Sequence, residues 1–507
     1  MQESSDYVII LDTDIHKKVE KGLYMDQSSL PIVEALQQHA KKLPDSFHVP
    51  GHKNGFVQPA YARDILSAAR FDQTELPGLD DLHDPRGVIA LAQQLTADIY
   101  GSRSAFFLIG GSTAGNMIMI IAALQEGDVV FVQRDTHKSI INGLRLVKAQ
   151  PVFLEPEYDE TSGLPLGLSI PTVQEAFHYH PEAAALIVNR PGYYGWTSPL
   201  GAIIGEAKKH GALVLVDEAH GAHFPAGDVF PDSAVSLGAD LVVHSAHKTL
   251  PALTMTGYLH VGRSSRIHSE DVQEAAAMIE SSSPSYLLLA SLDAARKYLH
   301  DLTQTDDTVL REQLQQTKQA VLQAGSLEEQ LPPEHVQADP LKIVARTPEG
   351  HTGWALQRYL EKEHVFTELA DEAHVVFFLS FQPLTTETLQ RIERGTDRLR
   401  SENPSVTPVA GVRSLPFSGM QKLPADWYKA GRGETEITTL ENAEYKQAAL
   451  DIVPYPPGVP LFLKGETLTG ERLDFLLGRL EQGGGVQGVR QSENGQWLTS
   501  IVKRKET

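Results

Sequence analysis

A lysine and an aspartate, each placed directly after an apolar run, are the residues of this sequence with the clearest chemical potential. Lys248 closes the tetrapeptide Ser245-Ala-His-Lys, and Asp217 follows the apolar run 213–216. A lysine amine can form a Schiff base with the aldehyde of pyridoxal phosphate (PLP), and an aspartate can pair with the pyridinium nitrogen of that cofactor. The charged ring then accepts the electrons of a bond broken at a substrate Cα. A lysine alone would be uninformative, but the two residues together predict a PLP site.

A glycine-rich turn supplies a candidate anion site. The segment Gly110-Gly-Ser-Thr-Ala-Gly-Asn116 follows an expected strand and precedes the apolar helical run 117–124. Backbone N–H groups at a helix start, together with the hydroxyls of Ser112 and Thr113, could bind a phosphate. An ordinary strand-to-helix turn explains the same residues equally well. The segment has no Walker A lysine, which disfavours a nucleoside triphosphate as the ligand.

Two other functions are suggested by short motifs and then disfavoured. Val216-Asp-Glu-Ala-His220 matches the acidic box of helicase-type ATPases, but that function needs a Gly-Lys-Ser/Thr tripeptide, which the sequence lacks. The histidine pairs 220/223 and 244/247 suggest a metal site. No third ligand at helical spacing and no cysteine accompany them. We therefore expect neither a helicase nor a metal site.

Two further segments place polar residues beside apolar ones. His137 follows an expected strand that ends at Val132, and its imidazole could stack on a cofactor ring or simply cap the next helix. The segment Glu75–Asp84 contains Asp80 and Asp81 among apolar residues. It could present carboxylates to a cationic ligand, or it could form a structural Asx turn. Both alternatives stay open at this point.

The composition describes an acidic protein without a disulfide framework. The 507 residues include no cysteine, and the formal net charge is −21 at pH 7. This charge argues against a nucleic-acid-binding surface, and the missing cysteines are compatible with a reducing cytoplasm. Acidic residues precede the first apolar run, which argues against a signal peptide, and no run approaches the roughly 20 apolar residues that span a bilayer. We expect a cytoplasmic protein with no nucleic-acid or membrane partner.

The pattern of apolar runs predicts an α/β fold. Between about residues 71 and 258, short β-branched runs alternate with helix-sized segments, which indicates βαβ units and a mainly parallel sheet. The expected strands are 105–109, 128–132, 151–154, 185–188, 213–216 and 240–243. The expected helices are 31–42, 287–299 and a surface helix within 301–330.

The length predicts two or three domains. We expect an N-terminal arm and helix over residues 1–75 and a large cofactor-binding domain over 76–300. A small α/β domain should follow over 301–403, then a linker near 404–416 that opens a C-terminal domain over 404–507.

Taken in order, the motifs resemble those of one family. The segments are Phe47-His-Val-Pro-Gly-His-Lys-Asn-Gly55, 75–85, 111–116, His137-Lys-Ser139, 216–223, 245–248 and Tyr455-Pro-Pro-Gly-Val-Pro460. Together they resemble the prokaryotic ornithine/lysine/arginine decarboxylases of aspartate-aminotransferase fold, and in particular the short Bacillus-type members without an N-terminal receiver-like domain. The resemblance is strong over about residues 30–300 and moderate in the C-terminal domain. It implies a PLP-dependent fold type I domain with a mainly parallel seven-stranded sheet, plus smaller C-terminal α/β domains.

The resemblance also implies a role for each matching residue. Lys248 would bind the cofactor covalently, Asp217 would pair with the ring nitrogen, and His137 would stack over the ring. His247 would contact the phosphate and could return a proton to the substrate Cα after CO₂ leaves. The remaining implied cofactor-binding residues are Ser112, Thr113, Ala114, Ala219, His220, Ser245 and Ser281. Ser281 would reach the phosphate of the neighbouring subunit, which implies a homodimer with shared active sites, or a higher oligomer built from it.

The implied reaction is the decarboxylation of a basic amino acid, arginine or lysine ahead of ornithine, in polyamine biosynthesis. A buried cationic end of such a substrate needs carboxylate partners. The sequence offers Glu75, Asp80, Asp81 and Glu466 as candidates. One segment departs from the family, because Arg190-Pro-Gly192-Tyr-Tyr-Gly stands where the family has Asn-Pro-Thr-Tyr-Tyr-Gly. Arg190 and Gly192 therefore bear on substrate specificity.

Two alternatives to a decarboxylase remain. Orientation decides which Cα bond breaks, so the same cofactor residues also fit a PLP-dependent aminotransferase or β-elimination lyase. A non-enzymatic regulator of the same fold would be expected to have a broken site, yet Lys248, Asp217 and His137 are all present.

Overall fold

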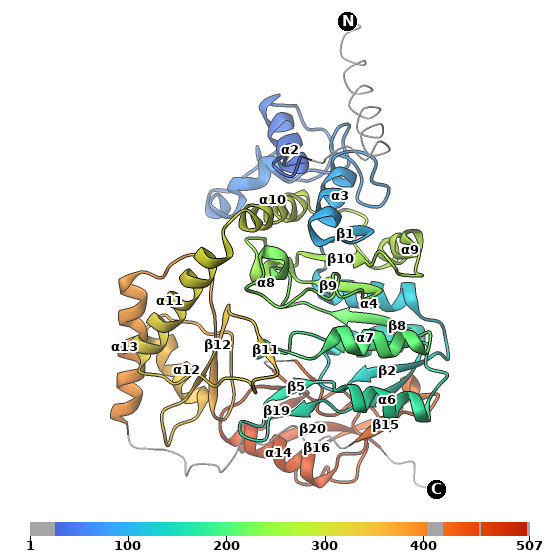
Figure 1. The fold of residues 1–507 in the computed structure, drawn as a ribbon, viewed down its shortest axis with the longest axis vertical. Helices are drawn as coiled ribbons and strands as arrows, with labels where there is room; N and C mark the ends of the chain where they lie inside the picture. The colour runs from blue at the N-terminus through green and yellow to red at the C-terminus, as the bar shows by residue number, and fades with distance from the viewer. Residues whose placement is uncertain (1–25, 403–418, 456–457, 504–507) are drawn as a thin grey trace, which may run out of the picture. The chain divides into compact units, whose positions relative to one another are not determined.

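The computed structural model describes residues 26–402, 419–455 and 458–503. Contacts between residues divide the chain into two compact units. The first unit holds residues 1–123, 213–228 and 232–306, and the second holds 124–212, 229–231 and 307–507. Because the chain passes between the units several times, each contains segments that lie far apart in the sequence (Figure 1).

Four strands of the first unit pair in the order β1-β10-β9-β8 (Figure 1). Their bounds are Ser104–Leu108 for β1, Gly257–Val261 for β10, Leu241–His244 for β9 and Leu213–Asp217 for β8. β10 runs antiparallel to both neighbours, whereas β8 and β9 pair in parallel, so three of the four strands share one direction. The parallel pair β8 and β9 therefore brings Asp217 and His244 to the same edge of the sheet, at their carboxyl ends.

The described part of the first unit also contains six α-helices. They are α2 (Pro31–Lys41), α3 (Val88–Tyr100), α4 (Gly111–Ala123), α8 (Ala246–Thr249), α9 (Ser269–Ile279) and α10 (Tyr286–Thr303), with short 3₁₀ turns at Ala60–Ala62, Ile65–Phe71 and Phe224–Ala226. Helix α4 packs on the strands at Gly115, where an added Cβ would lie 2.5 Å from Leu108 Cδ1 and 2.8 Å from Val243 Cγ1. Glycine at this position lets the helix approach the sheet closely enough to bring its N-terminus to the edge of the sheet.

The second unit contains another four strands in the order β6-β2-β3-β15. Their bounds are Ala185–Asn189 for β6, Val129–Gln133 for β2, Gln150–Leu154 for β3 and Met420–Lys422 for β15. The first three pair in parallel and β15 is antiparallel to β3. The helices α5 (Lys138–Val147), α6 (Ile170–Tyr179) and α7 (Leu200–Lys209) alternate with these strands along the chain. Short strands β4 (Glu157–Tyr158), β5 (Pro165–Gly167) and β7 (Trp196–Thr197) lie in the connections.

Two further apolar cores form within the second unit. One lies between α11 (Asp307–Gly325), α12 (Gly353–Lys362) and α13 (Thr386–Ser401) and the sheet of β12 (Lys342–Arg346), β14 (His374–Phe378) and β13 (Leu369–Ala370). β11 (Gln337–Ala338) pairs with β7. The other core joins α14 (Gly470–Glu481) to the sheet of β16 (Thr435–Thr439), β20 (Trp497–Val502) and β19 (Val489–Gln491). β17 (Val453–Pro454) pairs with β18 (Val486–Gln487), and a 3₁₀ turn covers Trp427–Lys429.

The expected α/β fold with mainly parallel strands is confirmed. All six strands expected from the sequence are present within two residues of their bounds, and the expected helices correspond to α2, α10 and α11. The two sets hold eight strands where seven were expected, because β15 adds one. The first part of the expected N-terminal arm and all of the expected linker, 404–416, lie outside the described residues. The four expected domains and the three boundaries between them stay predictions.

No helix in the described ranges is long and apolar enough to cross a membrane.

Candidate active site

Asp217, the last residue of β8, has a buried and fully engaged carboxylate. One oxygen, Oδ2, accepts a hydrogen bond from Asn116 Nδ2 at 2.7 Å, and Oδ1 accepts one from the backbone N–H of Ala219 at 3.1 Å. The residue is 3 % exposed. Both oxygens of this buried carboxylate are thus hydrogen-bond acceptors. This geometry fits a fixed negative charge that pairs with a cationic ring nitrogen.

Asn116 is a site residue that the sequence motif contained but did not identify. It lies on α4 and is 1 % exposed, and its partner Asp217 is 101 residues away in the sequence. An asparagine on the buried face of an apolar helix is the signal that could have singled it out, because a buried amide needs a hydrogen-bonding partner. The structure therefore adds Asn116 to the residues that hold Asp217.

Lys248 lies on the short helix α8, directly after β9. Its Nζ is 3.0 Å from Nε2 of His220, which lies on the loop after β8. Asp217 contacts Ala219 and Lys248 contacts His220, all within the first unit; their shared role in binding a cofactor stays a prediction. An imidazole nitrogen at this distance can accept a proton from a lysine ammonium.

His247 has one ring nitrogen committed to the backbone. Its Nδ1 lies 2.8 Å from the carbonyl oxygen of Thr256, and because a carbonyl only accepts, Nδ1 carries the proton of that bond. The neutral imidazole therefore has Nε2 as its basic atom. Nε2 could take up a proton, and once it carries one it could donate to a phosphate or to the substrate Cα; both roles of His247 stay predictions.

The hydroxyls of the predicted phosphate site meet at the start of α4. Ser245 Oγ donates to Ser112 Oγ at 2.7 Å, and Ser245 is fully buried. The turn needs Gly111 because its φ is +69°, a conformation that side chains rarely adopt. Thr113 and Ala114 follow in the first turn, with Thr113 exposed. A helix start carrying several hydroxyls is a suitable anion site, and phosphate binding here stays a prediction.

Ser281 comes directly after Glu280, a residue that bonds to the same turn. Its backbone oxygen accepts from His83 Nε2 at 2.8 Å, and its hydroxyl is exposed. The preceding Glu280 accepts hydrogen bonds from the N–H groups of Ile109 and Gly110, each at 3.2 Å. Burial raises the pKa of the Glu280 carboxyl. The exposed Ser281 hydroxyl is compatible with its predicted contact to a neighbouring subunit.

His137 belongs to the second unit and begins α5. Its Nδ1 lies 2.8 Å from Ser139 Oγ and accepts from the Ser139 N–H at 3.2 Å, so the imidazole caps this helix. A Cβ added to Gly458 would lie 3.2 Å from His137 Cδ2. The capping role that the sequence left open is thus present. Stacking of the same ring on a cofactor stays a prediction. Residues 456 and 457 of the neighbouring Tyr455–Pro460 motif lie outside the described residues.

The four acidic residues predicted to bind substrate lie in different surroundings. Asp80 Oδ2 accepts from three backbone N–H groups at the start of α3, at 2.8, 2.9 and 3.2 Å, and Asp80 Oδ1 accepts from a fourth. Asp81 Oδ1 accepts from the N–H of His83 at 2.8 Å. These bonds are the structural turn that the sequence left open as an alternative. Glu75 is exposed and accepts from the neighbouring Thr74 hydroxyl.

Glu466 lies in the C-terminal part of the chain between two arginines. Its Oε2 is 3.6 Å from Arg134 Nη2 and 3.4 Å from Arg472 Nη1, and its side chain is 8 % exposed. Burial lowers the pKa of Arg134 to about 10, against the opposing effect of Glu466, so Arg134 stays protonated at neutral pH. The charge of Glu466 is thus already matched, whereas the Glu75 carboxylate is exposed.

The segment that departs from the family forms a tight turn in the second unit. Arg190 is 3 % exposed and joins Pro191 by a cis peptide bond. The Gly192 N–H donates to Trp196 O at 2.9 Å, and Lys342 Nζ donates to Tyr193 O at 3.0 Å. A buried guanidinium at the end of β6 is a chemical change from the family's asparagine. Its effect on specificity stays a prediction.

These residues fit PLP. A held carboxylate, a lysine amine and a hydroxyl-bearing helix start correspond to the ring nitrogen, aldehyde and phosphate of this cofactor. All three lie in the first unit: Asp217 ends β8, Lys248 follows β9, and the helix start follows β1. Among the described residues, the chemistry of the donors matches the cofactor group by group.

Comparison with known sequences identifies relatives over almost the whole chain. The family model "Orn/Lys/Arg decarboxylase, major domain" matches residues 30–329, and "Orn/Lys/Arg decarboxylase, C-terminal domain" matches 413–503. The chain is 40 % identical over 483 residues to "Uncharacterized protein YaaO" of Bacillus subtilis (strain 168), covering 94 % of this chain and 99 % of that protein. It is 32 % identical over 481 residues to an arginine decarboxylase of Bacillus anthracis, covering 92 % and 96 %.

Solved structures show the same fold. The constitutive lysine decarboxylase of E. coli superposes with a TM-score of 0.76 at 19 % identity, covering 97 % of this chain and 84 % of that one. The lysine decarboxylase A of Pseudomonas aeruginosa also gives 0.76, at 20 % identity, covering 94 % and 81 %. A family model that matches more than half of the chain, and relatives at 32 % and 40 % identity, show that the chain belongs to the Orn/Lys/Arg decarboxylase family of PLP-dependent amino-acid decarboxylases.

Proposed function

We propose that the chain decarboxylates a basic amino acid, arginine or lysine ahead of ornithine, and so feeds polyamine synthesis in the cytoplasm. One observation supports this most directly. A doubly hydrogen-bonded Asp217 carboxylate ends β8, and the Lys248 amine lies on the helix that follows the adjacent parallel strand β9. Relatives named as arginine decarboxylases and lysine decarboxylases support the substrate class.

The residues of the chain divide the work of this reaction. When bound, PLP supplies an electron-accepting ring conjugated to the substrate amine. Asp217 holds a negative charge in place, since Asn116 and the Ala219 N–H fix both of its oxygens. His220 Nε2 lies 3.0 Å from Lys248 Nζ, so His220 would hold in place the amine that would bind the cofactor aldehyde.

Proton return completes the reaction. His247 donates Nδ1–H to Thr256 O, so its Nε2 is the atom that would hold and then deliver a proton. Its neighbour in the sequence is Lys248, and both residues lie on α8. A preset tautomer avoids reorganisation during the proton transfer.

Substrate choice must come from the distal cation, because every amino acid presents the same α-amine and α-carboxylate. A guanidinium or ammonium that loses water needs a carboxylate partner. Asp80 and Asp81 are engaged with backbone N–H groups and Glu466 with two arginines. We therefore assign the cation contact to Glu75 ahead of the other three.

A carbon dioxide assay with arginine, lysine and ornithine tests the proposed reaction. Purified holoenzyme should release CO₂ and form one amine per CO₂ from arginine or lysine. Glu75→Gln should raise KM for that substrate by about 10-fold or more with little change in kcat, because the lost contact binds the ground and transition states alike. Keto-acid or aldehyde products without CO₂ would instead establish an aminotransferase or lyase.

We also propose that the enzyme is a homodimer built on the segment 43–65. Seven large apolar side chains in this segment are more than half exposed, among them Phe47 at 97 % and Phe56 at 93 %. The other five are Leu43, Val49, Val57, Tyr61 and Ile65. Apolar exposure of this density marks an interaction surface.

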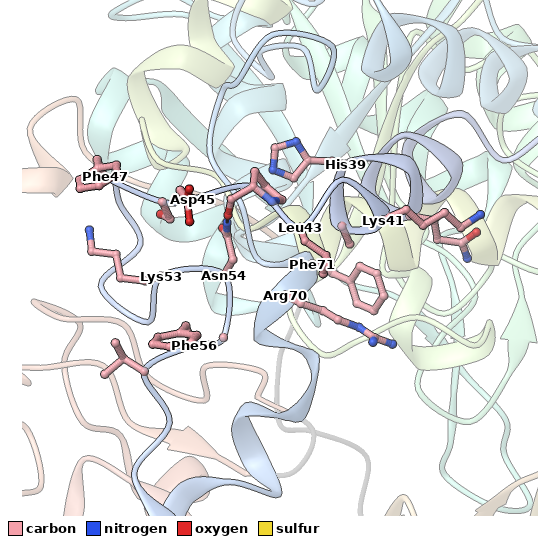
Figure 2. A pocket seen from close by; sticks show the side chains of 16 residues that line it. His39, Lys41, Leu43, Asp45, Phe47, Lys53, Asn54, Phe56, Arg70 and Phe71 are labelled. Carbon is pink, nitrogen blue, oxygen red and sulfur yellow. Dashed lines mark hydrogen bonds between the residues drawn. The ribbon is translucent and has the colours of Figure 1, made fainter.

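The charge of the same region indicates a second copy of the chain as the partner. A hollow of about 1030 Å³ lies within residues 37–71, and Figure 2 shows Phe47, Lys53 and Phe56 together on one side of it. Residues 37–71 contain five Lys or Arg and two Asp, a net charge of +3, so the rest of a chain of charge −21 carries −24. A basic, apolar segment on an acidic protein complements the remaining surface of another copy.

A further inference from the structure

A buried glutamate and histidine join the two strand ends that carry the cofactor-binding residues. Glu218 follows Asp217 at the end of β8, and His244 is the last residue of β9, directly before Ser245. His244 Nε2 lies 2.7 Å from Glu218 Oε2, and both side chains are 0 % exposed. The cofactor-binding roles assigned above include neither residue, and the mechanism above does not use them.

The carboxylate of Glu218 is held by several further hydrogen bonds. Its Oε2 also accepts from Ser233 Oγ at 2.7 Å, and its Oε1 accepts from the Ala234 N–H at 2.9 Å. The Ser233 hydroxyl and the Ala234 N–H donate to the Glu218 carboxylate, and His244 Nε2 lies within hydrogen-bonding distance of the same group. Buried charge-assisted bonds of this kind are strong, and removing one partner leaves the other unsatisfied.

Two other buried rings pack against His244. Its ring centroid lies 5.0 Å from that of Tyr100 and 5.0 Å from that of His260. The Tyr100 hydroxyl donates to Ala222 O, in the loop that also holds His220. Backbone bonds run beside the pair, from Glu218 N to Val243 O at 2.9 Å and from Ser245 N to Ala219 O at 3.3 Å.

We propose that Glu218 and His244 are a positioning pair that fixes Asp217 relative to the turn carrying Ser245 and Lys248. Each member is adjacent in sequence to a residue of the cofactor site, so a shift of either strand end changes the distance between the ring-nitrogen partner and the amine. A cofactor held at both places tolerates little such change, because catalytic groups must be held within about 0.5 Å of their working geometry. This inference rests on the proposed cofactor function.

The test compares Glu218→Ala, His244→Ala and their double variant as PLP-loaded enzymes. Each single variant should raise the dissociation constant of PLP by about 10-fold or more, the effect typical of outer residues that orient a ligand-binding group. Each should also shift the absorbance maximum of the bound cofactor and lower kcat more than it raises KM. The double variant should be no worse than the poorer single variant, because both remove the same interaction.

His260→Ala is the matched control. His260 is equally buried, packs on His244 and bonds Ser102 instead of Glu218, and burial holds the pKa of its imidazole well below the usual value. It should lower the melting temperature of the cofactor-free protein as much as His244→Ala does, yet leave the PLP dissociation constant and spectrum unchanged.

Two outcomes would overturn parts of this proposal separately. If His260→Ala weakens PLP binding as much as Glu218→Ala and His244→Ala, the pair acts only through general stability and the positioning role is wrong. If the unaltered protein itself does not bind PLP, the proposed cofactor function fails first.

Discussion

At the scale of single residues, the chemistry depends on a few side chains held by specific hydrogen bonds. Asp217→Ala should lower kcat/KM by about 100-fold or more, since it removes a fixed charge from a buried site. His137→Ala should cost a smaller factor, because stacking orients a ring without changing its charge. Asn116→Ala should have an intermediate effect in the native background and none in the Asp217→Ala background, since it acts through that carboxylate. Steady-state kinetics of the PLP-saturated variants measure this order, and equal losses for Asp217→Ala and His137→Ala would contradict it.

The sequence could predict residues of this kind when they belong to a contiguous motif. Lys248 and Asp217 were recognisable because each follows an apolar strand. Asn116 and the Glu218–His244 pair were not, because hydrogen bonds across 101 and 26 residues depend on which strands and helices become neighbours. The partners of the Asp80 and Glu466 carboxylates could not be predicted for the same reason. Asp80 binds backbone N–H groups and Glu466 lies beside two arginines, and both arrangements depend on the folded structure.

At the scale of elements, the bonds of Asp80 make a prediction about α3. Its carboxylate reaches the N–H groups of Gly87, Ile89 and Ala90, which would otherwise lack partners at the helix start. Asp80→Ala should therefore reduce the free energy of unfolding by about 1–2 kcal/mol, as other losses of a helix cap do. Asp80→Asn, which keeps an acceptor oxygen, should recover part of that loss.

The same two variants separate capping from substrate binding. Thermal melting measures stability, and KM for the basic amino acid measures binding. Asp84→Ala is the control, since its carboxylate pairs with Arg86 on the surface and should contribute little. A steep rise of KM in Asp80→Asn with unchanged melting would show that Asp80 binds the substrate cation after all.

The elements themselves were largely predictable, for a physical reason. Buried strands are continuous apolar runs, whether paired in parallel or at an antiparallel edge such as β1, so six strands could be placed within two residues. β15 was not, because its three residues, Met420 to Lys422, have no apolar pattern and form a strand only by pairing with β3.

At the scale of the whole molecule, measuring the oligomeric state tests whether the exposed apolar segment 43–65 forms the proposed dimer interface. Replacing Phe47 and Phe56 together by serine should convert a dimer to a monomer in sedimentation or light-scattering measurements, because both rings lose apolar contact area. Tyr179→Ser is the control, since that ring is also exposed but lies on α6. A dimer that persists in the double variant would place the interface elsewhere.

Mixed dimers test whether the two subunits share their active sites. Lys248→Ala should be inactive, and a Ser281→Ala, Glu75→Gln double variant should be weak. After exchange of subunits at equal concentration, half of the dimers are mixed and each contains one intact site, so about a quarter of the native activity should return. Verified exchange without any gain would mean that each site is complete within one chain.

The claim on which the proposed function depends is that Lys248 holds the cofactor. Borohydride reduction of the PLP-loaded protein, followed by digestion and mass spectrometry, locates the modified lysine directly. We expect a single phosphopyridoxyl group on the peptide that contains Lys248, and no modification of that peptide in Lys248→Ala, which should also lose turnover. Label on another lysine of the native protein, or on none, would contradict the assignment.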